Sequence, residues 1–190
     1  VPELVDYQID IKDKILKTLN LELDKTRCMI SLPTGGGKTR VAVEAFLDWM
    51  IPKFENEKYM IWIAQSEELC EQCISCIEQM WSSREFILPL TIYRYFSKYE
   101  INEEDLQGGV VVASINKIHN GLKDNSKVIK DIIYNTGAMI IDEAHRASSY
   151  MYDLLFEEAS NLTNGKLFPV CGLSATPGRN TIIYNSDVEK

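Results

Sequence analysis

The chain alternates between short apolar runs and longer segments whose apolar residues recur every three or four positions. The short runs lie at 28–32, 59–64, 90–95, 110–114, 138–141 and 170–173. Such continuous runs are typical of strands that are covered on both faces. The longer segments predict helices at 9–19, 40–50, 66–81, 127–134 and 150–160. This alternation predicts an α/β fold of three layers, with a mostly parallel central sheet.

A glycine-rich segment, Leu-Pro-Thr-Gly-Gly-Gly-Lys-Thr at 32–39, joins the first expected strand to a helix. Glycines let successive backbone N–H groups turn toward one anion, and the helix N-terminus adds its positive dipole end. The Lys38 ammonium can then reach the β- and γ-phosphates, and the Thr39 hydroxyl can bind Mg²⁺. The alternative is a glycine-rich turn before an unrelated lysine, which the flanking strand and helix disfavour. The predicted nucleotide-binding residues here are Pro33, Thr34, Gly35, Gly36, Gly37, Lys38 and Thr39.

A second polar group, Asp-Glu-Ala-His at 142–145, follows the expected strand 138–141. In an open α/β sheet, ligands bind beyond the carboxyl ends of the strands, so this group and the glycine-rich segment share an edge. Asp142 can hold Mg²⁺, and Glu143 can activate the water that attacks the γ-phosphate. His145 points either to the phosphates or to a neighbouring strand end. The alternative is a polar strand terminus without chemistry.

Tyr7 and Gln8 precede the glycine-rich segment by about thirty residues. A glutamine amide can make paired hydrogen bonds to adenine, and a neighbouring aromatic ring can pack against the base. Taken alone, the pair would indicate only the start of a surface helix.

Composition and charge narrow the class of protein. The 190 residues suit one domain, 1–190, and no apolar run approaches the roughly 20 residues that span a bilayer. No signal peptide is visible and the cysteine count is odd, which favours the cytoplasm. The net charge of −8 argues against a strongly basic nucleic-acid surface, although a local groove can use backbone donors.

Three cysteines, Cys70, Cys73 and Cys76, have a spacing that resembles part of an iron–sulfur motif. Such a motif needs a fourth cysteine nearby, and Cys28 and Cys171 are distant in sequence. On a helix the three side chains would fan apart, so we expect buried or half-buried helix cysteines.

We interpret two further groups of residues as structural and not as parts of a site. His119 is expected in a loop or at the surface. Tyr93, Arg94 and Tyr95 could stack on bases, but their alternation along a strand favours packing in the core and at the surface.

The order of the motifs resembles that of superfamily 2 helicases of the DEAH-box type. The resemblance is carried by 32–39, by 142–145 and by Ser-Ala-Thr-Pro-Gly-Arg at 174–179. The first and the last of these together are more similar to the DNA-acting group around type III restriction subunits. Leu32 stands where the general phosphate-binding pattern has glycine.

Shorter matches extend the resemblance over nearly the whole chain. Residues 63–69 resemble motif Ia, residues 111–114 resemble motif Ib, and Tyr7 with Gln8 resembles the Q motif. Motif Ia commonly has arginine where this chain has Glu67, which removes one contact to a nucleic-acid phosphate.

The resemblance implies an N-terminal RecA-like P-loop NTPase domain that uses ATP and Mg²⁺. It implies that Ser66 and Ser114 lie by the nucleic-acid backbone, DNA being favoured over RNA. It also implies a set of residues that couple the nucleotide state to nucleic-acid binding, namely His145, Ser174, Ala175 and Thr176.

The expected function is therefore the first motor domain of an ATP-dependent nucleic-acid helicase or translocase. A second RecA-like domain of the full-length protein is absent from this segment, so the segment alone is expected to bind ATP but hydrolyse it poorly. The alternatives are a nucleotide-gated nucleic-acid sensor and a restriction-type translocase without strand separation. A small P-loop kinase is disfavoured because it has no use for the segments 142–145 and 174–176.

Overall fold

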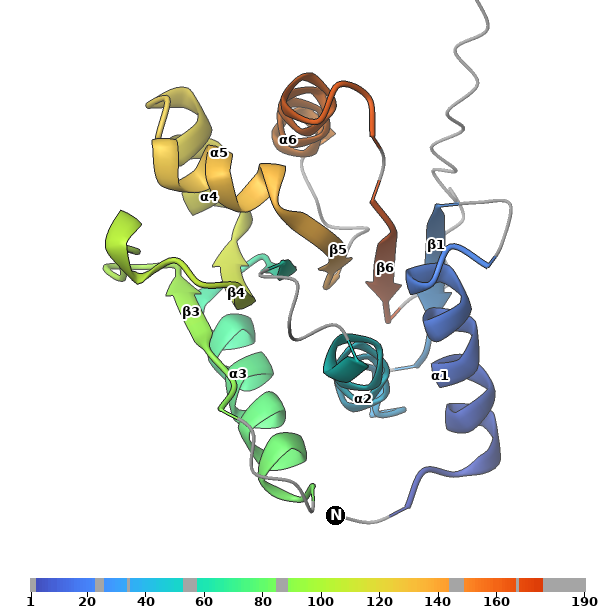
Figure 1. Ribbon diagram of the computed structural model, residues 1–190. Coiled ribbons are helices and arrows are strands. Elements are labelled where there is room, and N and C mark those ends of the chain that lie inside the picture. The colour runs from blue at the N-terminus through green and yellow to red at the C-terminus, as the bar shows by residue number, and fades with distance from the viewer. Residues whose placement is uncertain are drawn as a thin grey trace, which may run out of the picture.

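A parallel β-sheet of six strands forms the centre of the molecule in the computed structural model (Figure 1). The structure describes residues 3–22, 26–33, 35–52, 58–84, 89–143, 149–166 and 168–175. The strands stand in the order β1-β6-β5-β2-β4-β3, and every described pairing is parallel. Their bounds are β1 (Arg27–Ser31), β2 (Tyr59–Ala64), β3 (Ile92–Tyr95), β4 (Gly109–Ser114), β5 (Thr136–Ile141) and β6 (Val170–Ser174).

Two layers of helices cover the faces of the sheet (Figure 1). One layer consists of α1 (Asp6–Leu19), α2 (Lys38–Met50) and α3 (Glu67–Ser82). The other consists of α4 (Ile115–Lys123), α5 (Lys127–Tyr134) and α6 (Ser149–Leu162). A short 3₁₀ helix, η2 (Glu103–Asp105), lies in the acidic stretch between β3 and β4. The expected three-layer α/β fold is therefore confirmed, with a sheet that is parallel throughout its described part.

Alternation along the central strand β2 divides the core in two. Because successive side chains of a strand point to opposite faces, Met60, Trp62 and Ala64 pack toward α1, α2 and α3. Tyr59, Ile61 and Ile63 pack toward α4, α5 and α6. These six side chains are all at most 2% exposed, which explains why the sequence shows an unbroken apolar run instead of an alternating one.

Most of the expected elements are confirmed, with small shifts at their ends. The strand 59–64 and the helix 127–134 have the predicted bounds, and α1 begins at Asp6, so Tyr7 and Gln8 lie in its first turn. Gly137 lies within β5. Because the helix ends at Tyr134, Thr136 is free to pair in the sheet one residue before that glycine.

The helix α4 was not predicted, and its position corrects the expectation for His119. The apolar residues Ile115, Ile118 and Leu122 follow helical spacing and are buried. His119 lies on the same helix and is only 7% exposed, in contact with Tyr150 at a ring-centroid distance of 5.6 Å. It is a buried helix residue because α4 packs against α6.

The tyrosines of β3 and the cysteines of α3 lie where they were expected. Tyr93 and Tyr95 are buried in the core. Cys70 and Cys73 are buried and Cys76 is half-buried along α3. No helix in the described part of the chain is long and apolar enough to cross a membrane.

Candidate nucleotide-binding site

The segment after β1 turns sharply and leads directly into α2. Gly35 and Gly37 have φ values of 81° and 77°, a left-handed conformation that glycine adopts at little cost. Between them, the Gly36 N–H donates to the Pro33 carbonyl at 2.9 Å. Gly37 is the N-cap of α2, so Lys38 is the first residue of the helix and Thr39 the second. Thr34 lies outside the described residues.

At two positions of this turn, a side chain in place of glycine would come too close to a neighbouring atom. A Cβ atom on Gly36 would lie 3.0 Å from the Pro33 carbonyl oxygen. A Cβ atom on Gly37 would lie 2.6 Å from Nε2 of Gln8. The turn therefore presents backbone N–H groups and the helix N-terminus, which is the arrangement that binds phosphate groups.

Lys38 contacts both carboxylates that follow β5. Its Nζ atom lies 3.2 Å from Oδ1 of Asp142 and forms an ion pair with Oε1 of Glu143. The side chains are 12%, 5% and 15% exposed for Lys38, Asp142 and Glu143 respectively, so water screens these charges little. The structure thus brings together the three residues that the sequence assigned to phosphate binding, Mg²⁺ binding and catalysis.

The sheet fixes the position of the two carboxylates. The Asp142 N–H donates to the carbonyl of Ile63 at 2.8 Å, which extends the pairing of β5 with β2 by one residue. The chain then turns, because Glu143 has a left-handed φ of 51° and its N–H donates to Oδ1 of Asp142 at 3.0 Å. A non-glycine residue in this conformation costs about 1 kcal/mol or more, and such strain clusters at functional sites.

The donor set of this site suits a magnesium ion and a triphosphate. Mg²⁺ prefers carboxylate and hydroxyl oxygens together with phosphate oxygens, and Asp142 and Thr39 are positioned at the carboxyl edge of the sheet to supply the first two. One ammonium group faces two carboxylates, which leaves the group one negative charge in excess for a cation to neutralise. Among the described residues, no atom lies within 4 Å of where a Cβ atom of Gly35 would be, so the turn is open at that position.

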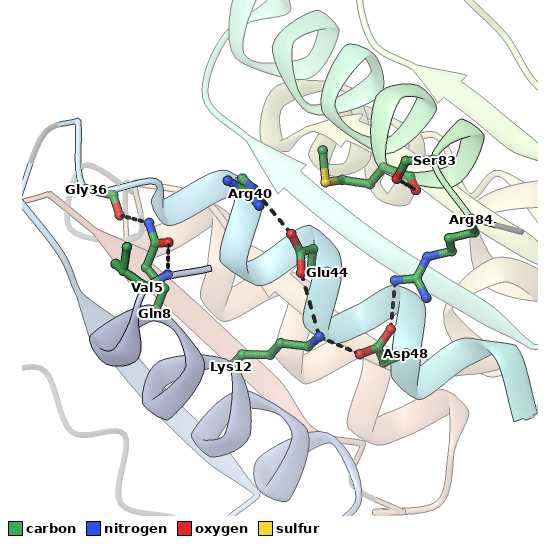
Figure 2. A network of polar contacts seen from close by, with 10 residues as sticks. Val5, Gln8, Lys12, Gly36, Arg40, Glu44, Asp48, Ser83 and Arg84 are labelled. Carbon is green, nitrogen blue, oxygen red and sulfur yellow. Dashed lines mark hydrogen bonds and ion pairs between the residues drawn. The ribbon is translucent and has the colours of Figure 1, made fainter. Parts of the chain in front are cut away.

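The first turn of α1 contacts the glycine-rich turn directly (Figure 2). Nε2 of Gln8 donates to the Gly36 carbonyl at 3.1 Å, and the Tyr7 hydroxyl donates to the same oxygen at 3.3 Å. Oε1 of Gln8 accepts from the Val5 N–H at 3.2 Å. The structure therefore places both residues at the site, through a contact that sequence reasoning missed, and adenine recognition by them stays a prediction.

A charged network holds α1 against its neighbours (Figure 2). Lys12 of α1 lies 2.6 Å from Asp48 and 3.7 Å from Glu44 of α2, and Arg84 lies 2.7 Å from Asp48. Burial alone would raise the pKa of Asp48, but hydrogen bonds from Lys12 and Arg84 outweigh it and hold the pKa below its usual value. The network fixes the helix that carries Tyr7 and Gln8.

The two serines that the sequence assigned to nucleic acid both cap helices. Oγ of Ser66 accepts from the Leu69 N–H at the start of α3, and Oγ of Ser114 accepts from the Lys117 N–H at the start of α4, both at 3.3 Å. Ser114 ends β4 directly beside Ala64 of β2. Both helix N-termini thus open on the same edge of the sheet as the nucleotide site.

The predicted coupling segment is described in part. Ser174 ends β6 and is buried, and its carbonyl accepts from the Leu32 N–H at 3.0 Å at the beginning of the glycine-rich segment. Ala175 follows and is half-buried, while His145 and Thr176 lie outside the described residues. The part that is described lies next to the strand that leads into the nucleotide site.

Known proteins with related sequences are ATP-dependent helicases. The chain is 26% identical to IRC3 of Saccharomyces cerevisiae, assigned as an ATP-dependent helicase, over 92% of this chain and 24% of that protein. It is 28% identical to the ATP-dependent DNA helicase mph1 of Aspergillus niger over 91% of this chain and 14% of that protein. The chain thus spans a quarter or less of the curated relatives that it matches.

Solved structures of a helicase domain and of a restriction-modification enzyme share the fold. The helicase domain of Hef from Pyrococcus furiosus has a TM-score of 0.65 and 25% identity, over 92% of this chain and 34% of that one. A nuclease-deletion mutant of the type ISP restriction-modification enzyme LlaGI, in complex with a DNA substrate mimic, has a TM-score of 0.58. At 17% identity, over 93% of this chain and 18% of that one, the LlaGI likeness shows the fold alone.

The family assignment covers almost the whole chain. The model of the family described as the type III restriction enzyme, res subunit, matches residues 2–179. That range includes the glycine-rich turn, both carboxylates and the strand that ends at Ser174. The chain belongs to this family, and its fold is that of the N-terminal RecA-like domain of superfamily 2 helicases.

Proposed function

We propose that this chain is the ATP-binding motor domain of a nucleic-acid-dependent ATPase that works as a helicase or translocase, with DNA as its substrate. The observation that carries the proposal is the placement of Lys38 against Asp142 and Glu143, at the end of the glycine-rich turn. Its membership of the restriction-subunit family and its likeness to ATP-dependent helicases support it.

In this proposal each residue at the sheet edge has a separate task. The backbone N–H groups of 37–39 bind the phosphates, and Lys38 exchanges its carboxylate partners for phosphate oxygens when ATP binds. Asp142 and Thr39 would hold Mg²⁺, which when bound would supply positive charge to offset that of the phosphates. Glu143 orients the attacking water and accepts its proton. The left-handed backbone at Glu143 aims its carboxylate away from the strand axis and toward Lys38.

The proposed nucleic-acid contacts use helix N-termini, which suits a chain of net charge −8. Backbone N–H groups at the start of α3 and α4 can bind phosphates without basic side chains. The first turn of α3 carries Glu67 and Glu68, whereas that of α4 has no acidic residue. We therefore expect the α4 end, beside Ser114, to be the stronger of the two contacts.

A second RecA-like domain of the full-length protein is part of the proposal, as the partner that completes the site. DNA is favoured over RNA because mph1 is named a DNA helicase and the family is that of a restriction subunit. Without the second domain, the charge of the transition state lacks an arginine finger, whose removal costs about 10³-fold or more. The segment alone should therefore bind ATP and turn it over slowly.

The proposal is tested with Lys38→Ala and Glu143→Gln in the full-length protein, using equilibrium binding of a fluorescent ATP analogue with Mg²⁺. Lys38→Ala is expected to weaken binding by about tenfold or more, because it removes a charge-assisted contact. Glu143→Gln is expected to keep binding while lowering turnover by roughly 100-fold or more.

Arg94→Ala is the matched control, because Arg94 also forms an ion pair, with Glu71 at 3.6 Å, but lies on β3 at the opposite edge of the sheet from β1. It should leave ATP affinity within about twofold of the unmodified protein. Equal losses of affinity in Arg94→Ala and Lys38→Ala would overturn the assignment of the site.

A further inference from the structure

Two cysteines from opposite ends of the chain face each other across neighbouring strands. Cys28 of β1 and Cys171 of β6 are partners in the parallel register, and their Sγ atoms share a hydrogen bond of 3.0 Å. Both thiols are free, and they are 143 positions apart in sequence. The sequence alone gives no indication of this pair, because only the strand order β1-β6 brings it together.

The backbone geometry suits a disulfide between them. Neighbouring strands lie about 4.8 Å apart, and disulfides join Cα atoms that are roughly 4.4–6.8 Å apart. The sulfur atoms need to approach by only about 1 Å to reach bonding distance. β1 lies at the edge of the described sheet, so it is paired on one side only, with β6.

The environment of the pair favours reaction at Cys28. The hydrogen bond that the two thiols share lowers the pKa of Cys28 against the effect of burial, and the Thr18 hydroxyl adds to this, while the same bond raises the pKa of Cys171. The half-buried side chain of Cys28 also gives a small oxidant access, whereas Cys171 is buried.

The cysteines of α3 differ from Cys28 in the direction in which their pKa is shifted. Burial raises the pKa of Cys70 to about 12, and nearby acidic residues add to the effect. Burial likewise raises the pKa of Cys76 to about 11. At neutral pH these thiols are therefore protonated, and a protonated thiol is a poor nucleophile toward an oxidant.

We propose that Cys28 and Cys171 form an oxidisable dithiol site, which takes hydrogen peroxide as its oxidant and closes to a reversible disulfide. The Cys28 thiolate attacks one peroxide oxygen, the O–O bond breaks, and Cys28 becomes a sulfenic acid while the other oxygen leaves as water after taking up a proton. The Cys171 sulfur then attacks the Cys28 sulfur, the S–O bond breaks, and a second water leaves. In sum, two thiols and one H₂O₂ give one disulfide and two waters.

The site lies on β1, the strand that leads into the nucleotide-binding turn, and on its neighbour β6. β1 continues into the glycine-rich segment, and β6 ends at Ser174, whose carbonyl already pairs with Leu32 at 3.0 Å. A disulfide between Cys28 and Cys171 would tie these two strands together covalently. It would also close a loop of more than 140 residues, which stabilises the folded state by restricting the unfolded one.

The test treats the purified full-length protein with hydrogen peroxide near stoichiometry, alkylates the remaining thiols, and maps peptides by mass spectrometry. We expect one cross-linked peptide pair that contains Cys28 and Cys171, its loss on treatment with dithiothreitol, and a rise of several degrees in the thermal midpoint of the oxidised protein. Cys28→Ser and Cys171→Ser should each abolish the cross-link and the rise. Cys76→Ser, the matched control, should retain both.

Three outcomes would overturn the proposal. The first is a cross-link that involves a cysteine of α3 in place of Cys28 or Cys171. The second is irreversible oxidation of Cys28 without a cross-link. The third is a cross-link that persists in Cys171→Ser. None of these outcomes depends on ATP turnover, so the proposed motor function is tested separately.

Discussion

Gly35 and Gly37 have the same backbone conformation but different surroundings. Their φ values of 81° and 77° are both left-handed. Among the described residues, a Cβ atom at Gly35 would meet nothing within 4 Å, whereas one at Gly37 would lie 2.6 Å from Nε2 of Gln8. Alanine at the two positions therefore separates the backbone cost from the cost of losing the contact between α1 and the nucleotide-binding turn.

The expected magnitudes follow from this geometry. Each alanine costs about 1–2 kcal/mol for the left-handed backbone. At Gly37 the Gln8 side chain must also swing away, which breaks its 3.1 Å hydrogen bond to the Gly36 carbonyl. A hydrogen bond of this kind contributes about 1 kcal/mol net. Gly37→Ala should therefore be about 1 kcal/mol more destabilising than Gly35→Ala.

Urea unfolding, monitored by tryptophan fluorescence, measures the free energy of unfolding of Gly35→Ala and Gly37→Ala, each with and without Gln8→Ala. In the Gln8→Ala background the two glycine substitutions should cost the same, giving a coupling energy of about 1 kcal/mol for the Gln8–Gly37 pair and about zero for Gln8–Gly35. A coupling that is equal for both pairs, or absent for Gly37, would refute the reasoning.

Three other predictions concern the fold. Tyr93→Phe should destabilise the protein by about 1–2 kcal/mol in urea, because the hydroxyl donates to a backbone carbonyl at 2.7 Å and accepts from a backbone N–H at 3.0 Å; an unchanged midpoint would contradict this. Asp48→Asn should cost about 1 kcal/mol at pH 7. The pKa of Asp48 is lower in the folded protein than in the unfolded one. Its contribution to the free energy of unfolding is therefore present above about pH 4, the unfolded pKa, and is lost as the pH falls through the folded pKa. A stability difference between Asp48→Asn and the unmodified protein that grows on acidification would refute this. Gly121→Ala should be destabilising by about 1–3 kcal/mol, since its Cβ would lie 2.5 Å from the Tyr95 hydroxyl, and adding Tyr95→Phe should restore much of the loss in thermal unfolding.

The parallel sheet covered on both faces and the core of the nucleotide site could be predicted because they depend on local pattern. A fully apolar run such as 59–64 is typical of a strand in the middle of a sheet that is covered on both faces. The glycines, Lys38 and the carboxylates after β5 could be assigned because parallel strands place their carboxyl ends at one edge. The structure places Lys38, Asp142 and Glu143 in contact, in agreement with that reasoning.

What the sequence did not reveal depends on tertiary contacts. The helix α4 contains Asn116, Asn120 and Gly121, whose helix propensities are poor, and burial of its apolar face against α6 overrides them. The left-handed conformation of Glu143 follows from the turn after β5 and has no signature in the sequence. The pairing of Cys28 with Cys171 requires the order of the strands, which no local pattern specifies.

The most direct test of the proposed motor function is steady-state ATP hydrolysis by the full-length protein, measured with and without duplex DNA, for the unmodified protein and Glu143→Gln. The proposal predicts that DNA stimulates hydrolysis by the unmodified protein and that Glu143→Gln removes the stimulated rate by roughly 100-fold or more while Mg²⁺-dependent ATP binding is kept. DNA-stimulated hydrolysis at the normal rate by Glu143→Gln would contradict the assignment of the catalytic site.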